Sequence, residues 1–309
     1  MIIFTNQPMQ NILLLLQNIL DKNEHISFDV LNPDLAEGYA GNKIIINNIT
    51  YLYRGYKAWT DLAELLQCKM LTPKESDYPL VTLCFKKLEK NNSFHLNKER
   101  EKEEKYGINS SFFSIQKMEE PAFLYYYLQA LKNVNIAHKK RILNLGINKA
   151  DEFKVIKKLL DTNKYQEIDF VGIDHSKTAI AYAKKEFPEK NITFYTHDIN
   201  KLDTLSLGKF DLFISIGTLQ STTLNFKPFF MSLVQTYLEK DAAIILGFPN
   251  SRWIGGEMIY GAKAPNYAMS EQSLLYNDVI FCKKYLQQKK FRVTLTGKQY
   301  LFLTATKIS

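Results

Sequence analysis

Cysteine is scarce in this sequence. Cys68, Cys84 and Cys282 are its three cysteines, they lie far apart, and no two of them form a Cys-x-x-Cys pair. An odd and dispersed set argues against a disulfide framework and against a cysteine zinc site. The histidines show neither a His-x-x-x-His spacing nor a cluster with cysteine. We therefore expect no metal site.

Long apolar runs are missing as well. Near the start of the chain the longest run covers residues 12–16, far short of the roughly 20 residues that a membrane helix needs. No lysine or arginine precedes this run and no small-residue cleavage site follows it, which is not the pattern of a signal peptide. Hydrophobic residues make up 46% and charged residues 23% of the 309 residues, values that exclude disorder and a coiled coil for most of the chain. We expect a soluble cytoplasmic protein with no membrane partner.

Arginine is rare among the basic residues. Only five of the 40 are arginine, although the net charge is +8. The charge is uneven, because residues 1–140 carry 17 basic and 16 acidic side chains, whereas residues 141–309 carry 23 and 16. A basic half can indicate an acidic partner such as RNA. Arginine binds phosphates and bases better than lysine does, because its planar guanidinium presents paired hydrogen-bond donors. A basic surface that consists mostly of lysine can therefore equally serve solubility.

The first part of the chain reads as a small α/β domain over residues 1–95. Apolar residues at helical spacing predict a helix over 8–22, and short strand-like pieces follow, the last at 80–85. Residues 97–105 (NKEREKEEK) are almost wholly charged, which is typical of a solvated linker. A helix over 119–131, with Pro121 in its first turn, completes a charged linker and lid helix over 96–136. From the residues alone, the segment 105–113 reads as a connector of core helices.

From residue 140 onward, strands and helices alternate. This alternation predicts a mainly parallel sheet with helices on both faces. A tight hairpin at Gly297-Lys298 closes the chain and makes the last strand antiparallel. The prediction for residues 137–309 is therefore an α/β, Rossmann-like fold with a mostly parallel seven-stranded sheet. Strands are expected at 141–145, 168–173, 192–195, 210–216, 242–248, 291–296 and 299–306, and Ser176 as the N-cap of a helix over 176–187.

Two segments of this region carry a family resemblance. They are Val171-Gly172-Ile173-Asp174-His175-Ser176 and the strand 210–216 with its continuation to Leu219. With the closing hairpin, residues 140–309 resemble the class I S-adenosylmethionine-dependent methyltransferases. The resemblance implies that Asp174 accepts hydrogen bonds from both ribose hydroxyls of S-adenosylmethionine and that Asp198 binds the adenine amino group beside Ile199. The resemblance also implies that the segment 105–113 covers the cofactor. The cofactor-binding residues that it implies are Gly146, Asn148, Asp174, His175, Asp198, Ile199, Ser215 and Gly217.

The first loop departs from the family pattern. Where the family has an acid two residues before three alternating glycines, this sequence has Asn144, followed by Gly146, Asn148 and Ala150. Asparagine tolerates unusual backbone angles, so the loop can still bind the cofactor. Two alternatives stay open. One is a non-catalytic binding or scaffold protein with a degenerate cofactor loop. The other is an NAD-dependent oxidoreductase, although the later glycines of the G-x-G-x-x-G motif that binds NAD are absent.

The resemblance implies an enzyme that transfers a methyl group by in-line displacement. Such a reaction needs mainly alignment of the acceptor and exclusion of water, and the sequence assigns no catalytic side chain. The long glycine-rich segment after the fifth strand is the best candidate for the acceptor surface. Its aromatic and basic side chains either clamp a base or phosphate or pack as a lid. The acceptor is RNA (tRNA or rRNA) or a small molecule. The candidate substrate-binding residues are Arg252, Trp253, Glu257, Tyr260, Lys263 and Tyr267.

Overall fold

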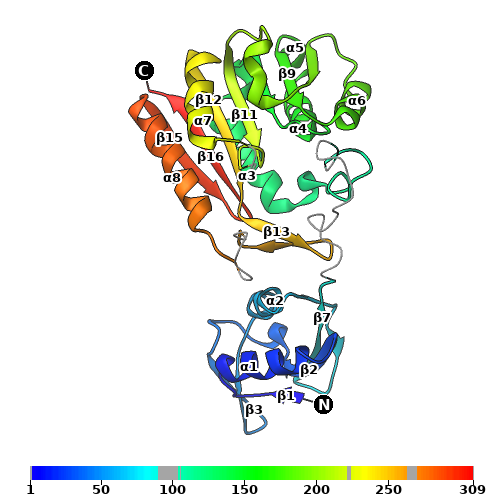
Figure 1. The fold of residues 1–309 in the computed structure, drawn as a ribbon. Helices are drawn as coiled ribbons and strands as arrows, with labels where there is room; N and C mark the ends of the chain where they lie inside the picture. The colour runs from blue at the N-terminus through cyan, green and yellow to red at the C-terminus, as the bar shows by residue number, and fades with distance from the viewer. Residues whose placement is uncertain (1, 90–103, 105, 221–223, 263–269, 309) are drawn as a thin grey trace. The chain divides into compact units, whose positions relative to one another are not determined.

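The chain groups into two compact units in the computed structural model, which describes residues 2–89, 104, 106–220, 224–262 and 270–308 (Figure 1). The N-terminal unit comprises residues 1–93 together with 253–259, and the C-terminal unit comprises 94–252 and 260–309. The domain limits drawn from the sequence, 1–95, 96–136 and 137–309, stay a prediction. The grouping adds one feature that the sequence did not indicate, because a short segment after the fifth predicted strand belongs to the N-terminal unit.

A small sheet with two helices forms the N-terminal unit. Its strands follow the order β1-β2-β7-β5, with β6 also on β7, and β3 and β4 form a separate hairpin. Helix α1 buries Ile12, Leu16 and Leu20, one residue per turn, as the apolar spacing predicts. The elements are β1 (Ile2–Phe4), α1 (Met9–Leu20), β2 (His25–Leu31), η1 (Pro33–Leu35), β3 (Lys43–Ile46), β4 (Ile49–Leu52), α2 (Tyr56–Leu65), β5 (Cys68–Met70), β6 (Lys74–Glu75) and β7 (Leu80–Lys87).

The C-terminal unit contains a seven-stranded sheet. Its order is β10-β9-β8-β11-β12-β16-β15. Neighbouring strands from β10 to β12 pair in parallel, whereas β16 pairs antiparallel with both β12 and β15. The predicted fold class is therefore confirmed, including the reversed last strand. The strands are β8 (Arg141–Leu145), β9 (Asp169–Asp174), β10 (Ile192–Thr196), β11 (Phe210–Ile216), β12 (Leu238–Pro249), β15 (Phe291–Gly297) and β16 (Tyr300–Lys307).

Helices cover both faces of this sheet (Figure 1). On one face, α7 and α8 enclose a buried apolar cluster that includes Leu143 and Leu246. On the other face, Phe153 of α4 contacts Phe170 and Phe194, and Tyr127 of α3 contacts Phe302. The helices are α3 (Pro121–Asn133), α4 (Asp151–Leu159), α5 (Thr162–Gln166), α6 (Lys177–Glu186), α7 (Phe226–Thr236) and α8 (Ser273–Gln288), with the short helices η4 (Lys117–Glu119), η5 (Ile136–His138) and η6 (Ile199–Thr204).

The segment after β12 is more ordered than the sequence indicated. Instead of a long loop it begins as a hairpin of β13 (Ser251–Ile254) and β14 (Glu257–Tyr260). Gly255 and Gly256 join the two strands with φ values of +56° and +84°. Two consecutive positive φ angles are what a two-residue hairpin turn requires, and glycine adopts them without steric cost. The glycines that suggested a flexible loop therefore form a tight turn.

Candidate functional site

The loop between β8 and α4 keeps an unusual backbone path. Gly146, Asn148 and Ala150 have φ values of +75°, +48° and +64°. These are the three positions at which the resembling family carries glycine, and all three are left-handed here although two of them are not glycine. Asparagine reaches this conformation at lower cost than alanine does. Asn148 thus adopts the left-handed backbone that asparagine tolerates.

Gly146 stands where a side chain does not fit. A Cβ atom at this position would lie 1.8 Å from the Thr218 hydroxyl oxygen. The Gly146 N–H donates to the Ile173 carbonyl of the neighbouring strand at 2.8 Å. The loops that follow β8, β9 and β11 therefore approach one another at a single edge of the sheet, as expected for the carboxyl ends of parallel strands.

Asp174 ends β9 and joins two of these loops. Its side chain is 7% exposed. Oδ2 accepts a hydrogen bond from the Asn148 N–H, and Oδ1 accepts one from the Ser176 N–H, both at 2.9 Å. Ser176 is the N-cap of α6, as predicted, because its hydroxyl accepts from the Ala179 N–H at 3.1 Å. Asp174 is thus a carboxylate held by backbone donors at the end of a strand.

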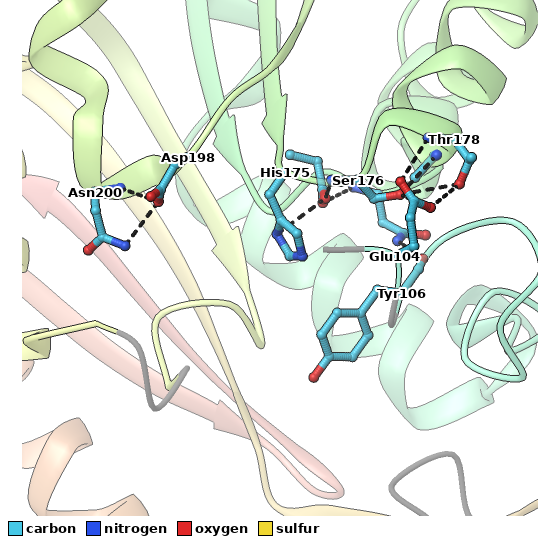
Figure 2. Close-up of polar contacts among 10 residues, drawn as sticks. Glu104, Tyr106, His175, Ser176, Thr178, Asp198 and Asn200 are labelled. Atoms are coloured by element: carbon cyan, nitrogen blue, oxygen red, sulfur yellow. Dashed lines mark hydrogen bonds and ion pairs between the residues drawn. The ribbon is translucent and has the colours of Figure 1, made fainter. Parts of the chain in front are cut away.

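Residues that precede the sheet contact the same loops. The Glu104 carboxylate accepts hydrogen bonds from the hydroxyls of Ser176, at 3.1 Å, and Thr178 (Figure 2). Burial opposes the charge of Glu104, but these hydrogen bonds outweigh it and lower the pKa of the carboxyl group. The Asn148 side chain donates to the Tyr106 carbonyl at 2.8 Å, and the Tyr106 ring lies edge-on to His175 with centroids 6.3 Å apart.

Lys149 anchors the next part of this segment. Its ammonium donates to the carbonyls of Phe113 and Ile115, at 2.9 and 2.8 Å, and lies 3.7 Å from the Asp151 carboxylate. Burial lowers the pKa of Lys149. The described residues between Glu104 and Ile115 are therefore held against the first and second loops. Part of the predicted segment 96–136, residues 96–103 and 105, lies outside the described residues.

The third and fourth loops hold the other predicted cofactor residues. Asp198 is exposed, and its Oδ1 accepts from both the N–H and the side-chain amide of Asn200 at 2.9 Å (Figure 2). These hydrogen bonds, the backbone one first, lower the pKa of Asp198. Ile199, which follows it, is half-buried. Ser215 is buried and donates to the Leu145 carbonyl at 3.1 Å, so its hydroxyl joins β11 to β8, while Gly217 is exposed with a φ of +74°.

The predicted substrate residues are not gathered at one described site. Arg252 donates to the Gly261 carbonyl at 3.3 Å and to the Ser270 hydroxyl, which fastens the base of the β13–β14 hairpin. Trp253 and Glu257 belong to the N-terminal unit. Tyr260 is 45% exposed. Lys263 and Tyr267 lie outside the described residues.

Two charged residues near the first loop escaped the sequence reasoning. Glu152, in the first turn of α4, is only 4% exposed, and burial raises the pKa of its carboxyl group to about 6. The signal for Glu152 was present, because it precedes buried Ile156 by four residues and so shares its helix face. The sequence around Lys117 carried no such signal.

The described residues contain no group of three histidine, cysteine, aspartate or glutamate side chains that could hold a metal ion. Among the helices that the structure describes, none has the length and apolar character to cross a membrane.

Comparison with known proteins places this site in a family. Residues 139–292 match the family model described as a methyltransferase domain. No curated protein sequence matches the chain.

Two solved structures illustrate similar folds. The plantazolicin methyltransferase BpumL is 13% identical, with a TM-score of 0.44, over 62% of this chain and 88% of that one. The N-methyltransferase NodS from Bradyrhizobium japonicum WM9 is 12% identical, with a TM-score of 0.42, over 61% and 89%. From the family match, the C-terminal part of the chain belongs to the class I S-adenosylmethionine-dependent methyltransferases.

Proposed function

We propose that the carboxyl ends of β8, β9 and β10 form the S-adenosylmethionine site and that Asp174 accepts hydrogen bonds from the ribose hydroxyls. The position of the Asp174 carboxylate carries this proposal. Each of its oxygens takes one backbone N–H at 2.9 Å, and an ionised carboxylate has about four acceptor positions. Two acceptor positions therefore stay available for a diol.

The backbone of the first loop supports cofactor binding over the degenerate-loop alternative. Its three left-handed residues, Gly146, Asn148 and Ala150, keep the path that glycines give the family. A left-handed backbone costs an alanine roughly 1 kcal/mol. A loop that no longer binds a ligand is not expected to retain this conformation at Ala150. Backbone strain of this kind persists where the surrounding structure maintains it, often at ligand sites.

The adenine end of the site would lie at Asp198 and Ile199. One Asp198 oxygen is engaged by Asn200, and the other is available to an amino group. His175, at the rim, would lie beside the nucleoside together with Tyr106. When bound, S-adenosylmethionine supplies an activated methyl group for in-line displacement. The chain's own part is to orient the two reactants and, through the segment held by Glu104 and Lys149, to exclude water.

The acceptor that we propose is RNA. The support is the charge of residues 141–309, with 23 basic against 16 acidic side chains, because a basic surface attracts a phosphate backbone. The hairpin tip 253–259, which contains two of the candidate substrate residues, belongs to the same compact unit as residues 1–93. We propose that this N-terminal unit selects the acceptor.

The first experiment is calorimetric titration with S-adenosylhomocysteine, with NAD as the control ligand. Mass spectrometry of the purified protein first checks for a retained ligand. Micromolar affinity, about −8 kcal/mol, is expected for S-adenosylhomocysteine and none for NAD. No binding by the folded, ligand-free protein would favour the scaffold alternative, and binding of NAD alone would favour an oxidoreductase.

The second experiment tests the acceptor. Transfer of a labelled methyl group to tRNA and rRNA is measured, together with RNA binding at increasing salt. Binding that falls steeply with salt and labelled RNA are expected. Labelling of a small metabolite extract without labelling of RNA would overturn the RNA proposal while leaving the cofactor site intact.

A further inference from the structure

A cavity of about 390 Å³ lies in the N-terminal unit. Its walls come from the turn after β2, the start of α2, strand β6 with its flanking residues, and the start of β7. Every lining residue falls within residues 32–81, which the family match at 139–292 does not include. Cavities of this size are typical of sites for small molecules.

Hydrogen bonds hold the walls of this cavity together. The Asn32 N–H donates to the Pro79 carbonyl at 2.9 Å, and the Asn32 side chain accepts from the Asp34 N–H at 3.0 Å. On the other side, β6 pairs with β7 and places Glu75 opposite Val81. The cavity is therefore built by the folded chain itself, and a ligand would bind without first having to order its walls.

The charged side chains of the wall are mostly negative. Asp34 and Glu75 are the two carboxylates among the lining residues, and Lys74 is the one cation. All three are exposed. Within the part of the chain that the structure describes, none of them forms an ion pair. Both carboxylates are therefore available to a ligand.

A buried carboxylate lies directly behind the wall. Asp29, on β2, is 4% exposed. It accepts hydrogen bonds from the hydroxyls of Ser76, at 3.1 Å, and Thr82, at 2.6 Å, and Ser76 lines the cavity. No cation of the described residues forms an ion pair with Asp29. Because hydroxyl groups do not neutralise a negative charge, the field of Asp29 adds to that of the two lining carboxylates.

The remaining wall is largely aromatic and apolar. Tyr56 and Tyr78 belong to it, and aromatic faces attract cations. The apolar lining residues are Leu35, Pro73, Pro79, Leu80 and Val81. A metal ion would leave this apolar surface unused, whereas an alkyl chain gains free energy by covering it.

We infer that this cavity binds a small aliphatic amine in its protonated form. Asp34 and Glu75 accept hydrogen bonds from the ammonium group, which carries several donors and no acceptor, and the alkyl chain lies against the apolar wall. Asp29 strengthens the preference for a positive charge, and Lys74 opposes it. The site lies beyond the proposed methyl transfer, because none of its residues belongs to the C-terminal unit, and it does not depend on cofactor binding.

The test compares three probes of equal chain length on the full chain. They are n-butylammonium, 1-butanol and butyrate, which carry a positive, a neutral and a negative head group. Saturation-transfer NMR at low salt measures the affinity of each probe. The variants are Asp34→Asn, Glu75→Gln and Lys74→Met. Asp21→Asn and Glu24→Gln, at exposed positions of the same unit outside the cavity wall, are the matched controls, and urea unfolding checks that each variant folds.

The wild type is expected to bind n-butylammonium with a dissociation constant of about 1 mM, which is realistic for so small a ligand, and to bind the other two probes at least about tenfold more weakly. Asp34→Asn and Glu75→Gln should each weaken n-butylammonium about threefold, because exposed ion pairs contribute modestly. Lys74→Met should instead strengthen it by about twofold, because a like charge is removed. The two control variants should follow the wild type.

Three outcomes would overturn the inference. One is that the folded wild type binds none of the probes, or binds n-butylammonium and 1-butanol equally well. Another is that butyrate binds best and that Lys74→Met abolishes its binding, which would make the cavity an anion site. The third is that the control variants weaken n-butylammonium as much as Asp34→Asn and Glu75→Gln do, because the attraction would then come from the general surface charge and not from this cavity.

Discussion

The Oδ2 atom of Asp174 accepts a hydrogen bond from the backbone N–H of Asn148 at 2.9 Å. This contact joins the end of β9 to the left-handed loop after β8, across 26 residues of sequence. The same carboxylate accepts from the Ser176 N–H, so it fixes two loops before any ligand binds. An acid at this position therefore organises the candidate site, and in the proposed function it also offers acceptors to a ribose.

Asp174→Asn is expected to weaken S-adenosylhomocysteine binding by about tenfold or more. The amide has one acceptor oxygen in place of two, so one backbone N–H loses its partner and the diol loses an ionised acceptor. Calorimetry measures the affinity. Asp169→Asn, at the exposed opposite end of β9, is the control, and an unchanged affinity of the Asp174 variant would contradict the assigned site.

Lys149→Met is expected to loosen the segment that contains Phe113 and Ile115. The substitution leaves both carbonyls without their ammonium donor, and each lost charge-assisted bond weakens the attachment. Hydrogen exchange followed by mass spectrometry should show roughly tenfold faster exchange over residues 106–116, which corresponds to about 1.4 kcal/mol. Lys154→Met, on the exposed face of α4, should leave this exchange unchanged. Equal rates in wild type and Lys149→Met would exclude an anchoring role.

Glu152→Gln is expected to change the pH dependence of stability. The pKa of Glu152 is raised by burial to about 6, from 4.5, although Lys117 and Lys149 oppose the shift and Asp151 adds to it. Between these values the folded state binds more protons than the unfolded state, so the free energy of unfolding falls as pH rises. Above pH 6 the full penalty is about 2 kcal/mol. Urea unfolding from pH 5 to 8 should show the glutamine variant gaining stability over the wild type as pH rises, whereas Glu186→Gln should follow the wild type. A constant difference in the free energy of unfolding between Glu152→Gln and the wild type across this pH range would refute the raised pKa of Glu152.

Gly146→Ala is expected to destabilise the protein by more than about 2 kcal/mol. The new methyl group would meet the Thr218 side chain at 1.8 Å, and the φ of +75° disfavours alanine. In a Thr218→Gly background the steric part disappears, and only the backbone cost of about 1–2 kcal/mol remains. A double-mutant cycle by urea unfolding measures this coupling. Additive effects of the two substitutions would show that Thr218 does not limit the space.

The sequence was sufficient for the fold of the C-terminal unit and for the position of Asp174 at the end of β9. Strand and helix order from residue 140 onward follows from hydrophobic periodicity, and the Ser176 cap and the closing hairpin follow from local turn chemistry. The expectation of a long loop after β12 was wrong. Gly255 and Gly256 suggested this loop, but consecutive glycines serve a tight hairpin turn equally well.

The sequence by itself determined which residues form each strand and helix of the large sheet and which acid ends β9, because periodicity and capping act over a few neighbouring residues. Only the tertiary structure decided that Glu104 meets Ser176 across 72 residues, that Glu152 is buried, and that Asn148 and Ala150 adopt left-handed backbone. These features depend on contacts between distant segments, on burial and on the field of several charges together. None of these quantities can be read from local spacing, because the same residues in a solvated helix or linker would produce the same sequence pattern.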